Sequence, residues 1–134
     1  MGSFLGDEVV HVLRGIQKTA PGGEIRTMST RLELPGRYAE SRVEYLDVYA
    51  ARIGDIGFLG VNCEVLTEAG QAIKAESPFK QTFVITICNG GEGYLPPKRL
   101  YKEGGYEVGL TTFAPEAADL LVKHAAKMLG DLRK

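Results

Sequence analysis

The chain has 134 residues, and 44% of them are hydrophobic. A chain of this length and composition can form one domain with a buried core and is too short for two domains to be expected. Its formal net charge is -1 and its basic residues are scattered, so it lacks the basic face that binds a nucleic-acid backbone. No apolar run approaches the roughly 20 residues needed to cross a bilayer, and no signal-peptide pattern opens the sequence. We therefore expect a soluble domain without nucleic acid as a partner, in a compartment that the sequence leaves open.

The first part of the chain predicts a helix followed by a strand. From Phe4 to Gln17 apolar residues recur at helical spacing, and Pro21-Gly22-Gly23 ends the segment. From Met28 to Leu34 apolar and polar residues alternate until Pro35-Gly36, which is the period of a half-exposed strand. An amphipathic helix and a strand with one buried face are expected here.

The middle of the chain predicts a hairpin and a strand, helix, strand unit. Residues 44–53 and 56–61 are expected to form antiparallel strands, because Gly54-Asp55 between them suits a tight turn. Residues 64–76 carry one helical stripe. Residues 82–88 form an apolar run without alternation, which is typical of a strand covered on both faces. The two strands that flank the helix should be parallel.

The last part predicts a long loop and a closing helix. Residues 89–109 are rich in Gly, Pro and Tyr, and loops of that length are usually functional or disordered. Apolar residues return at helical spacing over 117–132. The predicted fold is thus an α/β domain over residues 1–134, with a mixed sheet that contains a parallel βαβ unit and an antiparallel hairpin, and with helices packed against it.

A candidate site lies where the two parallel strands end, because ligands of open α/β sheets bind beyond the carboxyl ends of the strands. Glu64 follows the first strand and is expected at the start of a helix, where the helix dipole favours a carboxylate. Tyr94 follows the second strand after a glycine-rich segment. A carboxylate and a phenol should therefore converge, with four further residues as candidates for lining the site: Asn62, Cys63, Asn89 and Gly93. Taken singly, Glu64 and Tyr94 also fit an ordinary first-turn glutamate and a tyrosine that packs over the sheet edge.

The histidines and cysteines give weaker evidence for a functional site. His11 falls opposite the apolar stripe of the first helix and His124 at the edge of the stripe of the last, and neither neighbours another ligand at the spacing of a zinc site. Cys63 and Cys88 end adjacent predicted strands. Free thiols are the expected state, and a disulfide between them stays the alternative.

Seven short motifs follow one another between residues 54 and 115: Gly54-Asp55, Cys63-Glu64, Ser77-Pro78-Phe79, Asn89, Gly93-Tyr94-Leu95-Pro96, Gly104-Gly105-Tyr106-Glu107 and Ala114-Pro115. In this order, residues 53–129 resemble the last part of the catalytic domain of the neutral/alkaline non-lysosomal ceramidase family. Asn62-Cys63 stands here where that family has Pro-Gly before its glutamate.

The resemblance implies a zinc amidase in which two histidines from an earlier segment join a glutamate and a tyrosine around one Zn²⁺. The glutamate corresponds to Glu64 and the tyrosine to Tyr94. Zinc in such a site would polarise an amide carbonyl and lower the pKa of a bound water. The implied substrate of the complete protein is a lipid amide, ceramide, which is cleaved to sphingosine and a fatty acid. Because the histidines would precede this chain, we expect it to bind zinc weakly or not at all by itself and to be inactive alone.

Two other functions fit the same residues. The chain is alternatively a binding or assembly module that keeps the scaffold without catalysis, and a homo-oligomer would then hide the sheet surface that a missing half would bury. It is alternatively a metallohydrolase that acts on another amide or ester, because no residue pattern here identifies the tails of ceramide.

Overall fold

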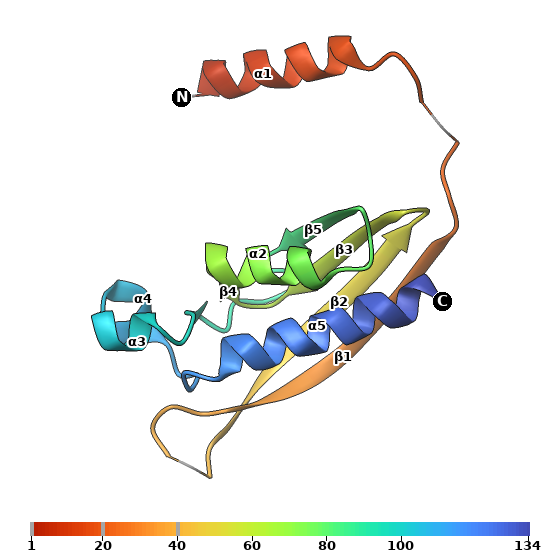
Figure 1. The fold of residues 1–134 in the computed structure, drawn as a ribbon. Coiled ribbons are helices and arrows are strands. Elements are labelled where there is room, and N and C mark those ends of the chain that lie inside the picture. The colour runs from red at the N-terminus through yellow and green to blue at the C-terminus, as the bar shows by residue number, and fades with distance from the viewer. Residues whose placement is uncertain (1, 20, 40) are drawn as a thin grey trace.

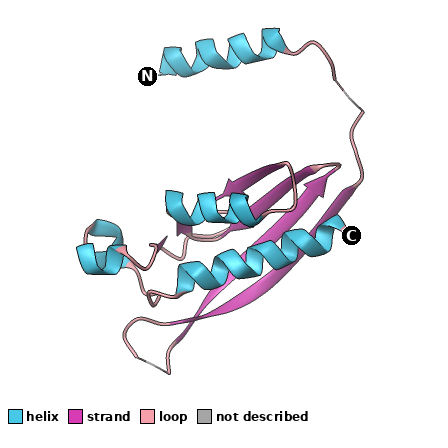
Figure 2. Ribbon diagram, in the orientation of Figure 1, coloured by secondary structure: helices cyan, strands magenta, loops and turns pink. Residues whose placement is uncertain are grey.

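The computed structural model describes residues 2–19, 21–39 and 41–134. A four-stranded sheet has the order β1-β2-β3-β5, and β4 pairs with β6 separately. Figure 1 shows α2 and α5 over one face of the sheet, and Figure 2 shows the same layers by type of element, with the first helix apart from them. The elements are α1 Gly2–Gly15, β1 Ile25–Pro35, β2 Val43–Ile53, β3 Ile56–Val61, β4 Glu64–Val65, α2 Thr67–Glu76, β5 Gln81–Ile85, β6 Tyr94–Leu95, α3 Leu100–Glu103, α4 Tyr106–Leu110 and α5 Ala117–Arg133.

The pairing of the strands confirms the predicted mixed sheet. β1 and β2 are antiparallel over their full length, and β2 and β3 form an antiparallel hairpin in which Ile53 faces Ile56. Gly54 takes a φ of 56° in its turn, a conformation that glycine adopts without strain. β3 and β5 run parallel, from Ile56 beside Gln81 to Gly60 beside Ile85, with α2 between them in the chain. The α/β fold class is thus confirmed.

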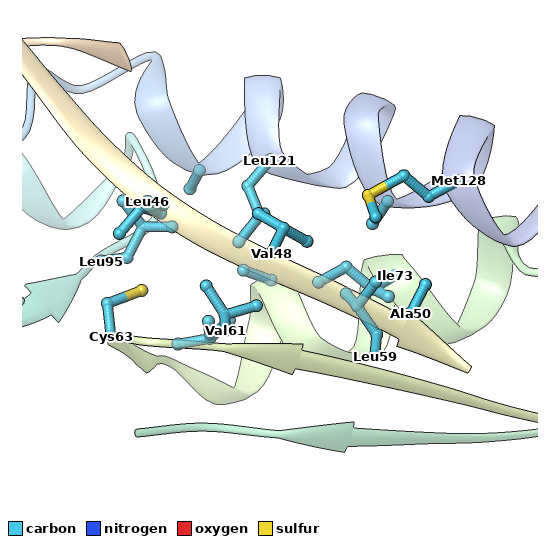
Figure 3. Close-up of a cluster of buried hydrophobic side chains, with 14 of the residues drawn as sticks. Leu46, Val48, Ala50, Leu59, Val61, Cys63, Ile73, Leu95, Leu121 and Met128 are labelled. Atoms are coloured by element: carbon cyan, nitrogen blue, oxygen red, sulfur yellow. The ribbon is translucent and has the colours of Figure 1, made fainter. Parts of the chain in front are cut away.

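The core lies between the sheet and the two helices α2 and α5. Alternate residues of the strands face the helices, since side chains of a strand point to opposite faces in turn. Figure 3 shows these side chains meeting those of α2 and α5. The buried residues that it labels are Leu46, Val48, Ala50, Leu59, Val61, Cys63, Ile73, Leu95, Leu121 and Met128.

The prediction that residues 82–88 form a strand covered on both faces is wrong. β5 ends at Ile85, and its side chains alternate between half-buried and exposed. Phe83 is 53% exposed and Ile85 47% exposed, because β5 is an edge strand and helices cover only one face of the sheet. An apolar run shows that a strand is hydrophobic on both sides, and it does not show that both sides are covered.

The prediction of an irregular loop over residues 89–109 is also wrong in part. This segment contains β6 and the short helix α3, and it runs into α4. Such brief elements carry too few residues for a period to be visible in the sequence. Contacts with distant segments hold them: β6 pairs with β4, and the hydroxyl of Tyr101 on α3 donates a hydrogen bond to the carbonyl oxygen of Phe113 at 2.8 Å.

The first helix forms as predicted, yet none of its residues is buried. Figure 1 shows α1 apart from the sheet, joined to β1 by a single connecting segment. Within the described residues, no helix is both long enough and apolar enough to cross a bilayer.

Candidate metal centre

Glu64 and Tyr94 lie directly beside each other on two short parallel strands. Glu64 is the register partner of Tyr94, and Val65 is the partner of Leu95. Val65 and Leu95 are buried, whereas Glu64 and Tyr94 are half-exposed. Since successive side chains of a strand point to opposite sides, the carboxylate and the phenol project from the same side of the pair, away from the core. The structure thus brings together the two residues that the sequence singled out, and their role as metal ligands stays a prediction.

The helix-start environment predicted for Glu64 is wrong. Helix α2 begins at Thr67, after Leu66 as its capping residue, so Glu64 precedes the first turn and belongs to β4. The backbone N–H of Glu64 donates a hydrogen bond to the carbonyl oxygen of Gly93 at 2.8 Å. This bond to the neighbouring strand, rather than a helix dipole, fixes the position of the glutamate.

Two hydrogen bonds tie the segment around Tyr94 to the rest of the fold, and a third fixes the hydroxyl of Thr111 that makes one of them. The backbone N–H of Glu92 donates to the carbonyl oxygen of Asn62 at 2.7 Å. The hydroxyl of Thr111 donates to the carbonyl oxygen of Tyr94 at 2.8 Å and accepts from the backbone N–H of Phe113 at 3.2 Å. Thr111 is 1% exposed, so its hydroxyl is a buried link between α4, β6 and the entry to α5. The backbone of Tyr94 is therefore held from two sides.

The carboxylate of Glu64 places negative charge near the Tyr94 phenol. The nearby carboxylate of Glu64 is the main reason that the pKa of Tyr94 is raised, followed by desolvation and by smaller effects of Tyr106 and Glu107. The rings of Tyr94 and Tyr106 meet edge to face, with centroids 5.8 Å apart and an interplanar angle of 75°. Without a cation, this environment keeps the phenol protonated; a divalent cation beside both oxygens would act in the opposite direction.

Glu64→Gln is expected to lower the pKa of Tyr94 toward the ordinary value for tyrosine, because it removes the largest cause of the upward shift. Glu107→Gln is the matched control and should change this pKa less, since Glu107 is the weakest of the causes. NMR of ring-labelled tyrosine across a pH titration measures the effect, with Tyr94→Phe to assign the resonance. Equal shifts in the two glutamine variants would contradict the pairing of Glu64 with Tyr94.

The four residues predicted to line the site are placed differently from one another. Gly93 directly precedes β6 with a φ of 81°, and its carbonyl oxygen accepts the hydrogen bond from the Glu64 N–H. Asn62 is 5% exposed, and its side-chain oxygen accepts a hydrogen bond from the backbone N–H of Asp47 at 2.9 Å. Asn89 is exposed with a φ of 60°. The Cys63 side chain packs in the core (Figure 3), where burial raises the pKa of its thiol to about 12.

The two cysteines are free, as expected, and point to opposite faces of the sheet. Cys63 belongs to the core beneath the helices, whereas a Cβ placed on Gly60 would meet the Cys88 sulfur at 2.7 Å on the face that no helix covers. The disulfide that the sequence left as an alternative does not form.

Neither histidine lies in a cluster of metal-binding side chains. His11 is exposed on α1, and the His124 ring forms a 2.7 Å hydrogen bond with the Thr30 hydroxyl. Among the described residues, no group of three or more His, Cys, Asp or Glu side chains is arranged to hold a metal ion. Among residues 2–19, 21–39 and 41–134, the Glu64–Tyr94 pair therefore stands as one carboxylate and one phenol without a third clustered ligand of these types.

Sequence reasoning missed two residues that shape the pair. Tyr106 contacts the Tyr94 ring, and Thr111 holds the Tyr94 carbonyl. Tyr106 lies in the Gly104-Gly105-Tyr106-Glu107 motif, so the motif marked its position without its contact. Nothing in the sequence around Thr111 distinguishes it from an exposed threonine.

Known proteins share this fold. A neutral ceramidase from Pseudomonas aeruginosa is similar with a TM-score of 0.60 and 23% identity, over 66% of this chain and 15% of that chain. A ceramidase in complex with C2 is similar with a TM-score of 0.59 and 23% identity, over the same shares of both chains. No family model matches the sequence, and no curated protein does. The similarity confirms, for the fold, the resemblance read from the motifs, and it spans a small part of the ceramidase chains.

Proposed function

We propose that residues 1–134 form a single domain that is equivalent to the carboxyl-terminal part of the catalytic domain of a ceramidase-like zinc amidase. In this proposal, Glu64 and Tyr94 are two of the zinc ligands. The observation that supports it most is the register pairing of Glu64 with Tyr94, with both side chains on one side of β4 and β6, in a fold similar to that of the ceramidases.

The Glu64 carboxylate and the Tyr94 phenol can supply part of the ligand set of a zinc ion. Carboxylate oxygen is a common zinc ligand, whereas zinc in proteins typically takes about three or four protein donors with His or Cys among them. The described residues supply no such cluster around the pair. The nitrogen donors would therefore come from a segment outside this chain, as the resemblance implies. When bound, zinc would act as a Lewis acid on the carbonyl of a lipid amide.

This chain would contribute the placement of two oxygen atoms. Backbone hydrogen bonds of β4 and Thr111 set the positions of Glu64 and Tyr94. Tyr106 packs its ring edge to face with Tyr94 and restricts how the phenol turns. Because these contacts lie within the chain, the oxygens keep their places in the isolated domain. Hydrolysis needs the missing donors as well, so we expect the domain to release no fatty acid from ceramide by itself.

Titration of the isolated chain with Zn²⁺ alone, followed by amide NMR, tests the proposal. We expect weak binding, since two oxygen donors are fewer than zinc sites normally have. The shifted amide resonances should belong to residues 62–65, 92–95 and 106–107. Glu64→Gln and Tyr94→Phe should each reduce these shifts.

Tyr106→Phe is the matched control, because it keeps the ring against Tyr94 and lacks only an exposed hydroxyl. It should leave the zinc-dependent shifts unchanged. Shifts that survive in both Glu64→Gln and Tyr94→Phe would overturn the assignment of the ligands. Tight stoichiometric binding that depends on Glu64 would overturn the statement that the site is incomplete in this chain.

A further inference from the structure

One face of the sheet carries apolar side chains that no element of the described chain covers. On this face β2, β3 and β5 present residues that alternate with those of the core. Together with Ile25 of β1, several of them are large and exposed: Val43, Tyr45, Ile53, Ile56, Phe83 and Ile85. We call this surface the open face. Parallel strand pairs such as β3 and β5 usually lie in sheets with both faces covered, so the open face lacks a layer that the topology favours.

The open face is hollowed where small residues form its floor. A hollow of about 460 Å³ is lined there by Thr27, Ser29, Ala51 and Gly60, among others. Tyr49, Phe58 and Ile85 also line it, and the Phe58 ring stacks on Phe83 with centroids 5.3 Å apart. A row of small residues beside bulky ones forms a trough into which the side chains of a helix can pack.

The described residues also include an amphipathic helix, α1, none of whose residues is buried against another element. The apolar stripe of α1 is exposed along its length, with Leu5 at 69%, Val9 at 51% and Leu13 at 60%. These residues are four apart and so lie on one face of the helix. Asp7 and His11 lie on the opposite face. Such a stripe is typical of a helix that packs against a hydrophobic surface.

The connecting segment brings this stripe within reach of the open face. Residues 16–24 join α1 to β1, and nine extended residues span up to about 30 Å. The segment enters the sheet at Ile25, two residues before Thr27, which already lines the hollow. The sheet is about 14 Å wide from β1 to β5 at ordinary strand spacing. A helix of 14 residues is about 21 Å long and therefore crosses it.

We propose that α1 folds back onto the open face of its own chain and seats Leu5, Val9 and Leu13 in the hollow. The domain then has helices on both faces of its sheet, with α1 opposite α5. The tether favours the helix of the same chain over that of a second copy, because a short linker raises the effective concentration of α1 to the millimolar range. The proposal does not depend on the metal centre, which lies on β4 and β6.

A native cysteine allows the docking to be measured. Cys88 lines the hollow, whereas the Cys63 thiol is buried in the core on the other side of the sheet. In Val9→Cys and in Leu13→Cys, mild oxidation should link the introduced thiol to Cys88 within one chain. Non-reducing electrophoresis and peptide mass mapping identify the link. The linked fraction should not change when the protein is diluted.

Asp7→Cys is the matched control, since it places a thiol on the opposite face of the same helix. It should form the link at least about tenfold more slowly, because a docked helix holds this position away from Cys88. Adding Cys88→Ser to Val9→Cys should abolish the fast link. Equal rates at the three positions of α1 would show an undocked helix and overturn the proposal. A link between chains that weakens on dilution would also overturn it and assign the open face to a second copy.

Discussion

Leu121→Ala is expected to lower the free energy of unfolding by about 2–5 kcal/mol. Leu121 is fully buried on α5, and Figure 3 shows its side chain directed at Val48 on β2. Truncation removes apolar contacts and leaves a cavity between two rigid elements that cannot both move to fill it. Because small domains are stabilised by about 5–15 kcal/mol in total, this one change removes a large part of their stability. Urea denaturation followed by circular dichroism measures the loss.

Leu120→Ala provides the matched control on the same helix. Leu120 is the neighbouring residue and is 39% exposed, so its truncation leaves no enclosed cavity. We expect it to cost no more than about 1 kcal/mol. Similar losses in the two variants would contradict the burial of the α5 stripe against the sheet.

Thr111→Val is expected to destabilise the domain by about 1–3 kcal/mol and to loosen β6. The substitution keeps the shape of the side chain and removes the hydroxyl that bonds the Tyr94 carbonyl and the Phe113 N–H. Both backbone groups would then lack a partner at a position that is 1% exposed. Urea denaturation gives the loss of stability, and hydrogen exchange along residues 94–95 and 111–113 reports the loosening.

Thr111→Ser separates the hydroxyl from the methyl group. Serine retains both hydrogen bonds and loses one buried methyl, which is worth about 0.8 kcal/mol. It should therefore leave hydrogen exchange around Tyr94 close to that of the unchanged chain. If serine and valine had the same effect on this exchange, packing rather than hydrogen bonding would hold Tyr94, and the described role of Thr111 would be wrong.

The long periodic segments of this fold could be predicted from the sequence. The β2–β3 hairpin follows from two apolar runs around Gly54-Asp55, and α5 follows from a repeating stripe over several turns. β4 and β6 could not be predicted in this way. Each has two residues, and they are strands because their backbones bond to each other across about 30 residues of chain.

The candidate site, too, could be predicted from the sequence only in part. The positions of Glu64 and Tyr94 after two parallel strands indicated that they would lie at one edge of the fold, and the motifs selected them among other acidic and aromatic residues. Their pairing as direct neighbours depends on long-range hydrogen bonds that no local pattern records. The hydrogen bond from Thr111 to the Tyr94 carbonyl and the contact of Tyr106 with the Tyr94 ring are also long-range, so the sequence did not predict them.

The outward orientation of Glu64 and Tyr94 determines how the pair can be complemented. Val65 and Leu95, which alternate with the pair along β4 and β6, point into the core. The oxygen atoms of Glu64 and Tyr94 are therefore accessible from the solvent side alone. A segment that supplies further ligands adds to an existing surface, and no buried side chain has to rearrange to admit it. Under the proposed zinc function, a separately produced polypeptide that carries imidazole donors would therefore meet the pair at this surface, and neither part would have to unfold.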